Sequence, residues 1–180
     1  MRGQREKDHI CLVPFGTIKS DFLREAGDAL GRQWPVEYVI LPAIPIPPSA
    51  FDVQRKQYNT APLLELLRHT EGDYHQIIGV IEFDLFHPKW SFVFHEADIV
   101  LGSALFSTYR LRPEYYGKIP DKKIFMNRVL TEMMHALGHI HGLHHCSNPY
   151  CPMYFSTSIG DTDRKGHIFC ATCQKKMSVE

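Results

Sequence analysis

The sequence predicts an α/β domain in which a twisted mixed β-sheet packs on about three helices, with a small cysteine-rich subdomain at the C-terminus. Three observations predict it. A strand–helix–strand pattern occupies the first forty or so residues, a long amphipathic helix begins near residue 121, and four of the five cysteines fall in the last 35 residues. A chain of 180 residues can bury a sizeable core. We expect a single domain over 1–180, with a sheet-and-helix lobe at 1–141 and a lower lobe at 142–180.

Charge and hydropathy exclude several classes of protein. Twenty basic and twenty acidic side chains cancel, so nothing favours binding to nucleic acid or to an anionic membrane surface. Residues 1–10 are polar and charged, unlike a secretory signal. The longest apolar stretches, such as Ile77–Ile81, are too short to span a bilayer. We expect a soluble, cytoplasmic and monomeric protein that binds neither nucleic acid nor membrane.

The first elements form a strand–helix–strand unit. Ile10–Phe15 reads as a short buried strand that ends at Gly16, and Val36–Leu41 is a second strand rich in branched residues. Between them, Ser20 or Asp21 is expected to cap a helix. Its apolar residues recur at helical spacing: Phe22, Leu23, Ala26 and Leu30. This order within about 30 residues predicts two parallel strands.

The middle of the chain continues the sheet. Prolines make Pro42–Pro48 an extended loop. Asn59 or Thr60 caps a further helix with Pro62 near its first turn. His75–Phe83 is apolar enough to be a central strand. The aromatic and β-branched segments that follow predict antiparallel or edge strands that close the sheet, namely Trp90–Phe94 and Ile99–Tyr109, with His95–Asp98 between them.

A long helix runs from Asp121 to about His141. Its apolar stripe is spaced four, three, four and three residues apart: Met126, Leu130, Met133, Leu137 and Ile140. That stripe lies almost opposite His135 and His139, so one face is expected to pack on the sheet while the other presents the two imidazoles. Side chains at i and i+4 are neighbours on a helix, and two neutral imidazoles at that separation can bind one zinc ion.

A third histidine completes a recognisable zinc motif. Gly142 can take the positive φ that ends a helix and reverses the chain, which would bring His145 back as a third ligand. This H-x-x-x-H-x-x-G-x-x-H spacing is that of the metzincin zinc peptidases. His144 is a weaker candidate, because only His145 has the three-residue offset from Gly142.

One residue departs from the motif. A glutamate normally follows the first histidine and acts as general base, but Ala136 stands there. Glu132 is a candidate surrogate base, with a surface or supporting role as the alternative. His141 and His144 could shuttle protons or be exposed loop residues. Tyr154 could assist an oxyanion or belong to the core.

The C-terminal cysteines predict a second metal site. Cys146 and Cys151 form a C-x4-C pair, and Cys170 and Cys173 form a C-x2-C pair 18 residues later. Four thiolates of this kind make a closed structural zinc site, although four free thiols or a nucleic-acid-binding knuckle are alternatives. Cys11, inside an apolar run, is expected to be a buried core thiol.

The chain resembles the archaemetzincins, small zinc proteins of the metzincin clan. The resemblance rests on the residues above, together with a Met-turn methionine at Met153, and it covers essentially the whole chain. Upstream, Ile44–Asn59 resembles the family's proline-rich loop, with Arg55, Gln57 and Tyr58. The gap from Met153 to Cys170 is one residue shorter than the usual pattern.

The resemblance implies a zincin-like (minimal metzincin) fold and two zinc ions per chain. One zinc would lie in a cleft under an edge strand, bound by the three histidines above a methionine floor, and the other would be held by the four cysteines. It implies a zinc metallopeptidase, a hydrolase whose activity is expected to be impaired by Ala136. The alternative is a catalytically inactive zinc protein that binds a peptide, a chain end or a partner through the cleft, for example by β-augmentation at Trp90–Phe94. A purely structural zinc fold is a third hypothesis.

Overall fold

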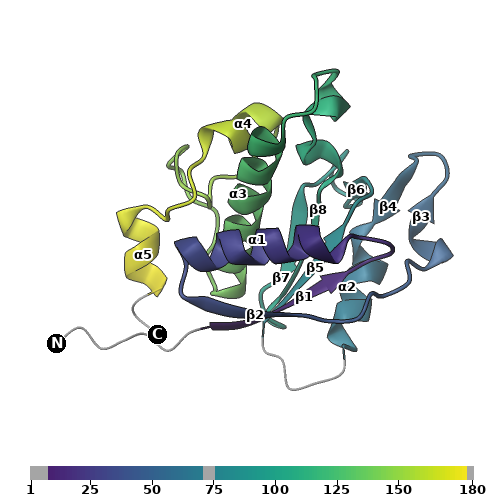
Figure 1. Ribbon diagram of the computed structural model, residues 1–180, viewed down its shortest axis with the longest axis horizontal. Coiled ribbons are helices and arrows are strands. Elements are labelled where there is room, and N and C mark those ends of the chain that lie inside the picture. The colour runs from purple at the N-terminus through teal and green to yellow at the C-terminus, as the bar shows by residue number, and fades with distance from the viewer. Residues whose placement is uncertain (1–7, 71–75, 178–180) are drawn as a thin grey trace.

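The computed structural model describes residues 8–70 and 76–177, and their strands form a mixed main sheet (Figure 1). Neighbouring strands are parallel except at one edge, where β7 (His95–Asp98) runs antiparallel to β8 (Ser103–Ser107). The predicted twisted mixed sheet is therefore confirmed. Within the described residues the strand order is β2 (Val36–Ile40), β1 (Asp8–Pro14), β5 (Ile77–Ile81), β8 (Ser103–Ser107) and β7 (His95–Asp98).

The first strand–helix–strand unit forms as predicted, with one correction at the start of its helix. Helix α1 (Ser20–Gln33) connects the parallel strands β1 and β2. Its N-cap is Lys19, whose side chain makes no capping hydrogen bond, so the prediction of Ser20 or Asp21 as cap is wrong. Both residues lie inside the first turn, and the carbonyl of Lys19 accepts the first helical bonds instead.

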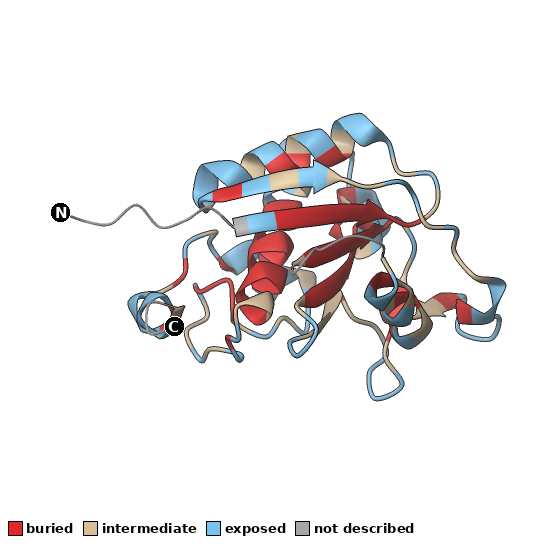
Figure 2. Cartoon of the chain, turned by 90° about the horizontal axis from the view of Figure 1, so that it is seen from below, coloured by how far each residue is buried: buried red, intermediate tan, exposed pale blue. Residues whose placement is uncertain are grey.

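Helices cover both faces of the main sheet. Alternate residues of a strand point to opposite faces, so Ile10 and Leu12 pack with α1 and α3 (Lys122–Ile140), while Cys11 and Val13 pack with α2 (Thr60–Arg68). Figure 2 shows the buried residues gathered in the strands and along the inner sides of the helices. The core thiol expected at Cys11 is confirmed, and burial raises its pKa to about 11.

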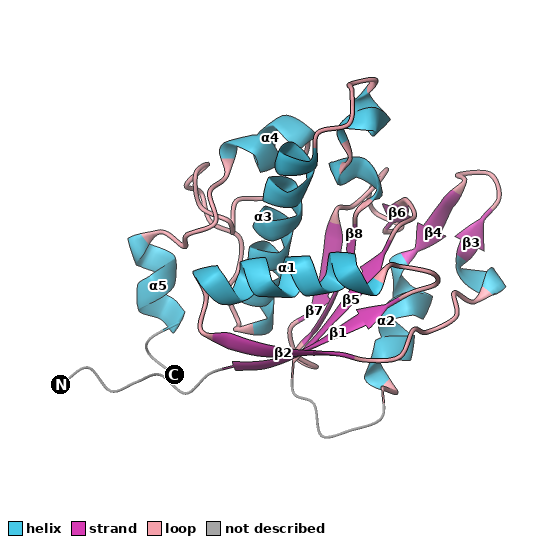
Figure 3. Ribbon diagram, viewed as in Figure 1, coloured by secondary structure: helices cyan, strands magenta, loops and turns pink. Residues whose placement is uncertain are grey.

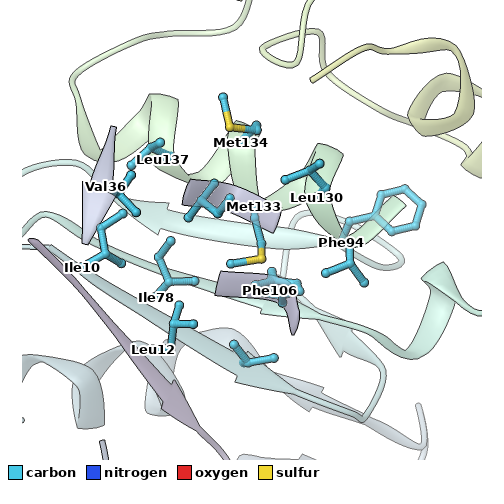
Figure 4. Packing of buried hydrophobic residues seen from close by; sticks show 14 of the residues in the cluster. Ile10, Leu12, Val36, Ile78, Phe94, Phe106, Leu130, Met133, Met134 and Leu137 are labelled. Carbon is cyan, nitrogen blue, oxygen red and sulfur yellow. The ribbon is translucent and has the colours of Figure 1, made fainter. Parts of the chain in front are cut away.

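Residues of α3 form the centre of the larger core. Figure 4 shows Met133 and Leu130 of α3 facing Ile78 and Phe106 of the sheet. This packing fixes the helix that carries the histidine motif against the strands, so the histidines occupy a rigid position.

A small second sheet follows the proline-rich loop. It consists of β3 (Phe51–Asp52), β4 (Gln57–Asn59) and β6 (Leu85–Phe86). Asn59 caps α2 by accepting a hydrogen bond from the Ala61 amide at 3.1 Å, as one of the two predicted alternatives required. Strands of two or three residues are too short to show an alternating pattern, which explains why the sequence did not predict this sheet. His75, the first residue of a predicted strand, lies outside the described residues.

The edge strand differs from the prediction. Trp90–Phe94 is predicted to be a strand, but it is irregular backbone with one isolated bridge at Val93, and it follows a turn that the Trp90 amide closes on the His87 carbonyl. Strand β7 is His95–Asp98, which was expected to be a connection. All four residues of β7 are half-buried, so they lack the alternation that marks a strand in sequence. Residues 99–102 form the turn into β8, where Gly102 has φ 61°.

Helix α3 begins and ends as predicted. The Asp121 carboxylate accepts a hydrogen bond from the Ile124 amide at 3.0 Å. At the other end Gly142 has φ 74°, its amide donates to the His139 carbonyl, and the Leu143 amide donates to the Gly138 carbonyl. These two bonds form a Schellman motif. The chain therefore reverses at Gly142, directly before His145.

Two short helices in the C-terminal segment raise the number of α-helices in the described residues to five, against the three or so expected. They are α4 (Ile159–Arg164), which begins with a capping box between Ser158 and Asp161, and α5 (Ala171–Met177) (Figure 3). The segment also covers α3, whose residues are buried on all sides from Arg128 to His139. The face that carries His135 and His139 is therefore covered as well as the apolar face. Single-turn 3-10 helices occur at Pro48–Ala50, Tyr109–Leu111 and Pro113–Tyr116. No helix in the described part of the chain is long and apolar enough to cross a membrane.

Candidate functional site

Three histidine rings converge at the C-terminal end of α3. The ring centroids of His135 and His139 are 4.7 Å apart, and that of His145 lies 5.4 Å and 5.0 Å from them. A tetrahedral zinc ion with Zn–N bonds of about 2.0–2.1 Å holds its imidazole centroids about 5 Å apart. His135 and His139 are buried, whereas His145 is exposed and packs on Phe155 at 4.8 Å. The spacing of the three rings matches one tetrahedral ion.

His95 of strand β7 joins this group, and sequence reasoning missed it. Its ring centroid lies 4.0 Å from that of His135 and 5.8 Å from that of His139. One nitrogen of each of these three residues lies within 4.8 Å of the others. His95 belongs to no motif, and it is about 40 residues from the helical pair, so only the fold brings it there.

Glu132, the candidate surrogate base, is fully buried one turn before the motif. Its Oε2 accepts a hydrogen bond from His95 Nδ1 at 3.0 Å, and its Oε1 accepts from Thr162 at 2.8 Å. Lys165 Nζ lies 3.1 Å from Oε1. Burial acts to raise the pKa of Glu132, but the Lys165 ammonium and the His95 hydrogen bond outweigh it and lower the pKa to about 2. A surface position is therefore excluded, and both carboxylate oxygens are engaged within the protein.

Lys165 contacts His135 as well as Glu132. Its ammonium also lies 3.1 Å from His135 Nδ1 and 3.2 Å from the Tyr154 carbonyl oxygen. An ammonium only donates, so Nδ1 accepts and the His135 proton resides on Nε2, which points at His139 Nε2 at 2.9 Å. His139 Nδ1 donates to the Leu143 carbonyl at 2.7 Å. His139 thus has the tautomer of a metal ligand, whereas His135 binds a cation through Nε2 as a neutral imidazole only if its proton moves to Nδ1 and the Lys165 ammonium moves away from that nitrogen.

Burial keeps the motif histidines neutral. It lowers the pKa of His139 to about 3, that of His135 well below the usual value and that of His145 in the same direction, with the nearby imidazole of His95 adding to each shift. Metal ligation requires neutral imidazole. The donor set of the pocket therefore fits a zinc ion near neutral pH.

Met153, which is predicted to form a floor beneath the histidines, packs against α3 at Gly138. It is fully buried, and its Sδ atom occupies the space next to Gly138, where a Cβ would collide with it and lie 3.0 Å from a ring carbon of Phe169. The Met153 carbonyl also accepts a hydrogen bond from the Cys146 amide at 2.9 Å. The bare backbone of Gly138 lets the methionine approach α3 within the histidine motif.

The four C-terminal cysteines gather into one cluster. Cys146 Sγ lies 3.8 Å from Cys170 Sγ, and Cys151 Sγ lies 3.8 Å from Cys173 Sγ. A tetrahedral zinc with Zn–S bonds of about 2.3 Å separates its sulfur atoms by about 3.8 Å, whereas a disulfide bond is about 2.05 Å long. Burial acts to raise the pKa of Cys170, but hydrogen bonds from the Cys173 backbone and the neighbouring thiols lower it to about 7. The thiol geometry fits a closed four-sulfur zinc site.

A pocket of about 240 Å³ opens beside the histidines. Strand β7 forms one wall, and apolar side chains form much of the rest. Its lining residues are His87, Trp90, Val93, His95, Glu96, Ala97, Ile99, His139, His145 and Phe155. The pocket therefore places an apolar surface and one strand edge next to the candidate metal ligands.

The other predicted residues do not line this pocket. Tyr154 offers its carbonyl oxygen to Lys165, and its proposed role with an oxyanion stays a prediction. His144 is exposed, and His141 packs near Trp34 at 6.1 Å. The residues of the proline-rich loop support the small sheet: Arg55 over the Phe86 ring, Gln57 with Asp84, and Tyr58 against Phe51.

Comparisons with known proteins agree with this arrangement. The profile of Peptidase family M54 matches residues 37–179. The archaemetzincin of Pyrococcus furiosus is 39% identical over 178 residues, covering 95% of this chain and 93% of its own, and that of Methanocaldococcus jannaschii is 38% identical over 168 residues, covering 93% and 92%. The crystal structure of archaemetzincin from Methanopyrus kandleri is similar with a TM-score of 0.85 at 29% identity, covering 99% of this chain and 97% of its own. A zinc-dependent peptidase from Methanocorpusculum labreanum gives 0.83 at 29% identity, covering 93% and 99%.

Proposed function

Because the chain belongs to peptidase family M54, the archaemetzincins, we propose that it is a zinc-dependent peptidase whose turnover is held low by Ala136. The observation that carries the proposal is the convergence of His135, His139 and His145, with ring separations of 4.7–5.4 Å, beside an open pocket. Ala136 is not a ligand, so its presence leaves this donor set intact.

The missing carboxylate explains the expected low rate. A zinc ion in such a site lowers the pKa of water to about 7 and polarises a carbonyl group. Positioned acid–base catalysis typically contributes a factor of about 10²–10⁴ in rate. The methyl group of Ala136, which is fully buried, can neither accept a proton nor return it to a leaving amine. Substrate binding is therefore expected to survive while hydrolysis slows by at least that factor.

We propose that the substrate is an extended peptide or a chain end. Within the described residues β7 pairs only with β8, so its other edge is available for β-augmentation. This moves the expected docking strand from Trp90–Phe94 to His95–Asp98. The side chains of Trp90, Val93 and Phe155 line the pocket, which favours an apolar residue next to the scissile bond.

The experiment compares wild-type protein with Ala136→Glu, both loaded with zinc, on a set of short unstructured peptides. We expect slow cleavage by the wild type and an increase of about 10²–10⁴ in kcat for the variant. An Ala136→Glu/His139→Ala double variant controls for contaminating peptidases and should be inactive. Cleavage by wild type that equals or exceeds that of Ala136→Glu would contradict the proposed role of position 136.

A second candidate function is peptide binding without hydrolysis, and Ala136 is the observation that favours it. In that case peptides bind the zinc-loaded wild type but remain intact over long incubation. Peptides N-methylated on alternate residues should then bind more weakly, because they cannot complete hydrogen bonds along β7. Binding without cleavage in wild type and in Ala136→Glu selects this function over the first.

We also propose a cytoplasmic location and a monomeric state. Thiols 3.8 Å apart suit metal binding in a reducing compartment. A single chain supplies the pocket and both ligand groups. Fractionation of cells and the molar mass from light scattering test these two points.

A further inference from the structure

We infer that His95 is a fourth ligand of the metal in the cleft, so that His95, His135, His139 and His145 form an all-imidazole site. The H-x-x-x-H-x-x-G-x-x-H motif supplies three of these residues, and β7 supplies the fourth. The inference rests on the proposed function only in that both concern the same metal.

The position of the His95 ring supports ligation. It lies 4.0 Å and 5.8 Å from the centroids of His135 and His139, on either side of the separation of about 5 Å expected around a tetrahedral ion. Of the histidines among the described residues, His95, His135 and His139 make the tight group, with one nitrogen each within 4.8 Å of the others.

The hydrogen bonding of His95 selects the nitrogen that can face a metal. Nδ1 lies 3.0 Å from Glu132 Oε2, and the ionised carboxylate only accepts, so Nδ1 is the donor and Nε2 is the nitrogen left for a cation. Metal-binding histidines commonly donate their second ring N–H to a carboxylate in this way, which fixes the ring and increases its basicity. Glu132 is thus a positioning residue for His95.

Glu132 holds His95 in place from a buried position of its own. It is paired with Lys165 at 3.1 Å, and the side chains of Glu132 and Lys165 are both fully buried. The His95 side chain is only 10% exposed, which limits competition from bulk water. The His95 ring is thus oriented by its partner and lies next to the two helical histidines.

The consequence is a metal without a free coordination position. A zinc peptidase keeps one position open for solvent and substrate, and a fourth imidazole occupies it. Ala136 on α3 and His95 on β7 then both lower the rate of hydrolysis. Ala136 provides no proton acceptor, and His95 takes the place of the solvent ligand. Hydrolysis requires His95 to leave the metal.

The test uses the full chain with zinc in the cysteine site and cobalt(II) titrated into the cleft. X-ray absorption at the cobalt edge counts imidazole ligands, and visible absorption reports the coordination number. We expect four imidazoles in wild type. His95→Ala should show three imidazoles with a solvent ligand and an affinity lower by at least about 100-fold, and Glu132→Gln should lose about 10–100-fold.

The control is His87→Ala, since His87 lines the same pocket but lies against Glu96 at 3.8 Å and should not change the cobalt spectrum. Zinc retained by the cysteines shows that each variant is folded, and His95→Gln repeats the test if His95→Ala is not. An unchanged affinity and spectrum in the His95 variants would overturn the inference. A separate variant, Ala136→Glu/His95→Ala, tests the proposed function. If it binds zinc but cleaves no peptide, the proposed peptidase function is refuted and the inference about His95 is unaffected.

Discussion

Met153 places its Sδ atom against the backbone of Gly138, in the space that a side chain at that position would need. Gly138 lies between the two helical histidines, one residue before His139. The contact joins the segment that follows the zinc motif to the helix that carries it. The position of the methionine floor therefore depends on the absence of a Cβ at residue 138.

Gly138→Ala should destabilise the protein by about 1–3 kcal/mol, because overpacking a tight core displaces Met153. The helix propensity of alanine offsets at most about 1 kcal/mol of this. Chemical denaturation measures the free energy of unfolding. The matched control is Gly31→Ala in α1, where a Cβ would lie 3.6 Å from the Val36 carbonyl oxygen, and this variant should be neutral or slightly stabilised. Equal stabilities of the two variants would refute the packing argument.

Lys165→Met should cost about 3–5 kcal/mol in unfolding free energy, because it leaves the buried carboxylate of Glu132 without its cation. Adding Glu132→Gln to this variant should recover part of the loss. The control is Arg164→Met, which removes a half-exposed side chain 3.6 Å from Asp161 and should change the stability by less than about 0.5 kcal/mol. A Lys165→Met protein as stable as Arg164→Met would show that the pair is not essential to the fold.

The metal-free protein should lose stability in acid. Burial lowers the pKa of His139 from 6.5 to about 3, so between these values the unfolded chain binds a proton that the folded chain does not. The free energy of unfolding therefore falls as pH drops below about 6.5, by up to about 1.4 kcal/mol per pH unit for this residue. Denaturation from pH 7 to pH 4 should show a shallower slope for His139→Gln. Identical slopes would contradict a buried neutral imidazole.

Cys170→Ser should reduce the zinc content from two ions per chain to one, because it removes a ligand from the four-sulfur cluster. Elemental analysis after dialysis against a weak chelator measures the content. Cys11→Ala is the control, since Cys11 is buried in the core between β2 and β5, and it should retain both ions. Loss of zinc from Cys11→Ala, or none from Cys170→Ser, would contradict the assignment of the cluster.

The parts of the fold that local sequence specifies were predictable. Asp121 and Gly142 mark the ends of α3 through their own side-chain and backbone chemistry. The spacing of the two cysteine pairs predicts a metal cluster, and the spacing of His135, His139 and His145 predicts that their rings converge.

The parts of the fold that depend on contacts between residues far apart in the sequence could not be predicted. Strand β7 is half-buried on both faces and has no alternation. His95 meets Glu132 across 37 residues, and Lys165 meets His135 across 30. The residues next to His95 and Lys165 in the sequence form no motif. Their partners come close only when the sheet, α3 and the C-terminal segment pack together. For this reason the sequence alone could not show whether Glu132 is buried or lies on the surface.

His145 and Cys146 are consecutive, and the Cys146 amide is fastened to the Met153 carbonyl at 2.9 Å. A single peptide bond thus connects the imidazole centre to the sulfur centre. A metal ion in the sulfur cluster would therefore also hold the backbone from which His145 reaches the cleft. Oxidation of the thiols would release that backbone, so damage by an oxidant at the protein surface would be transmitted to the imidazole centre.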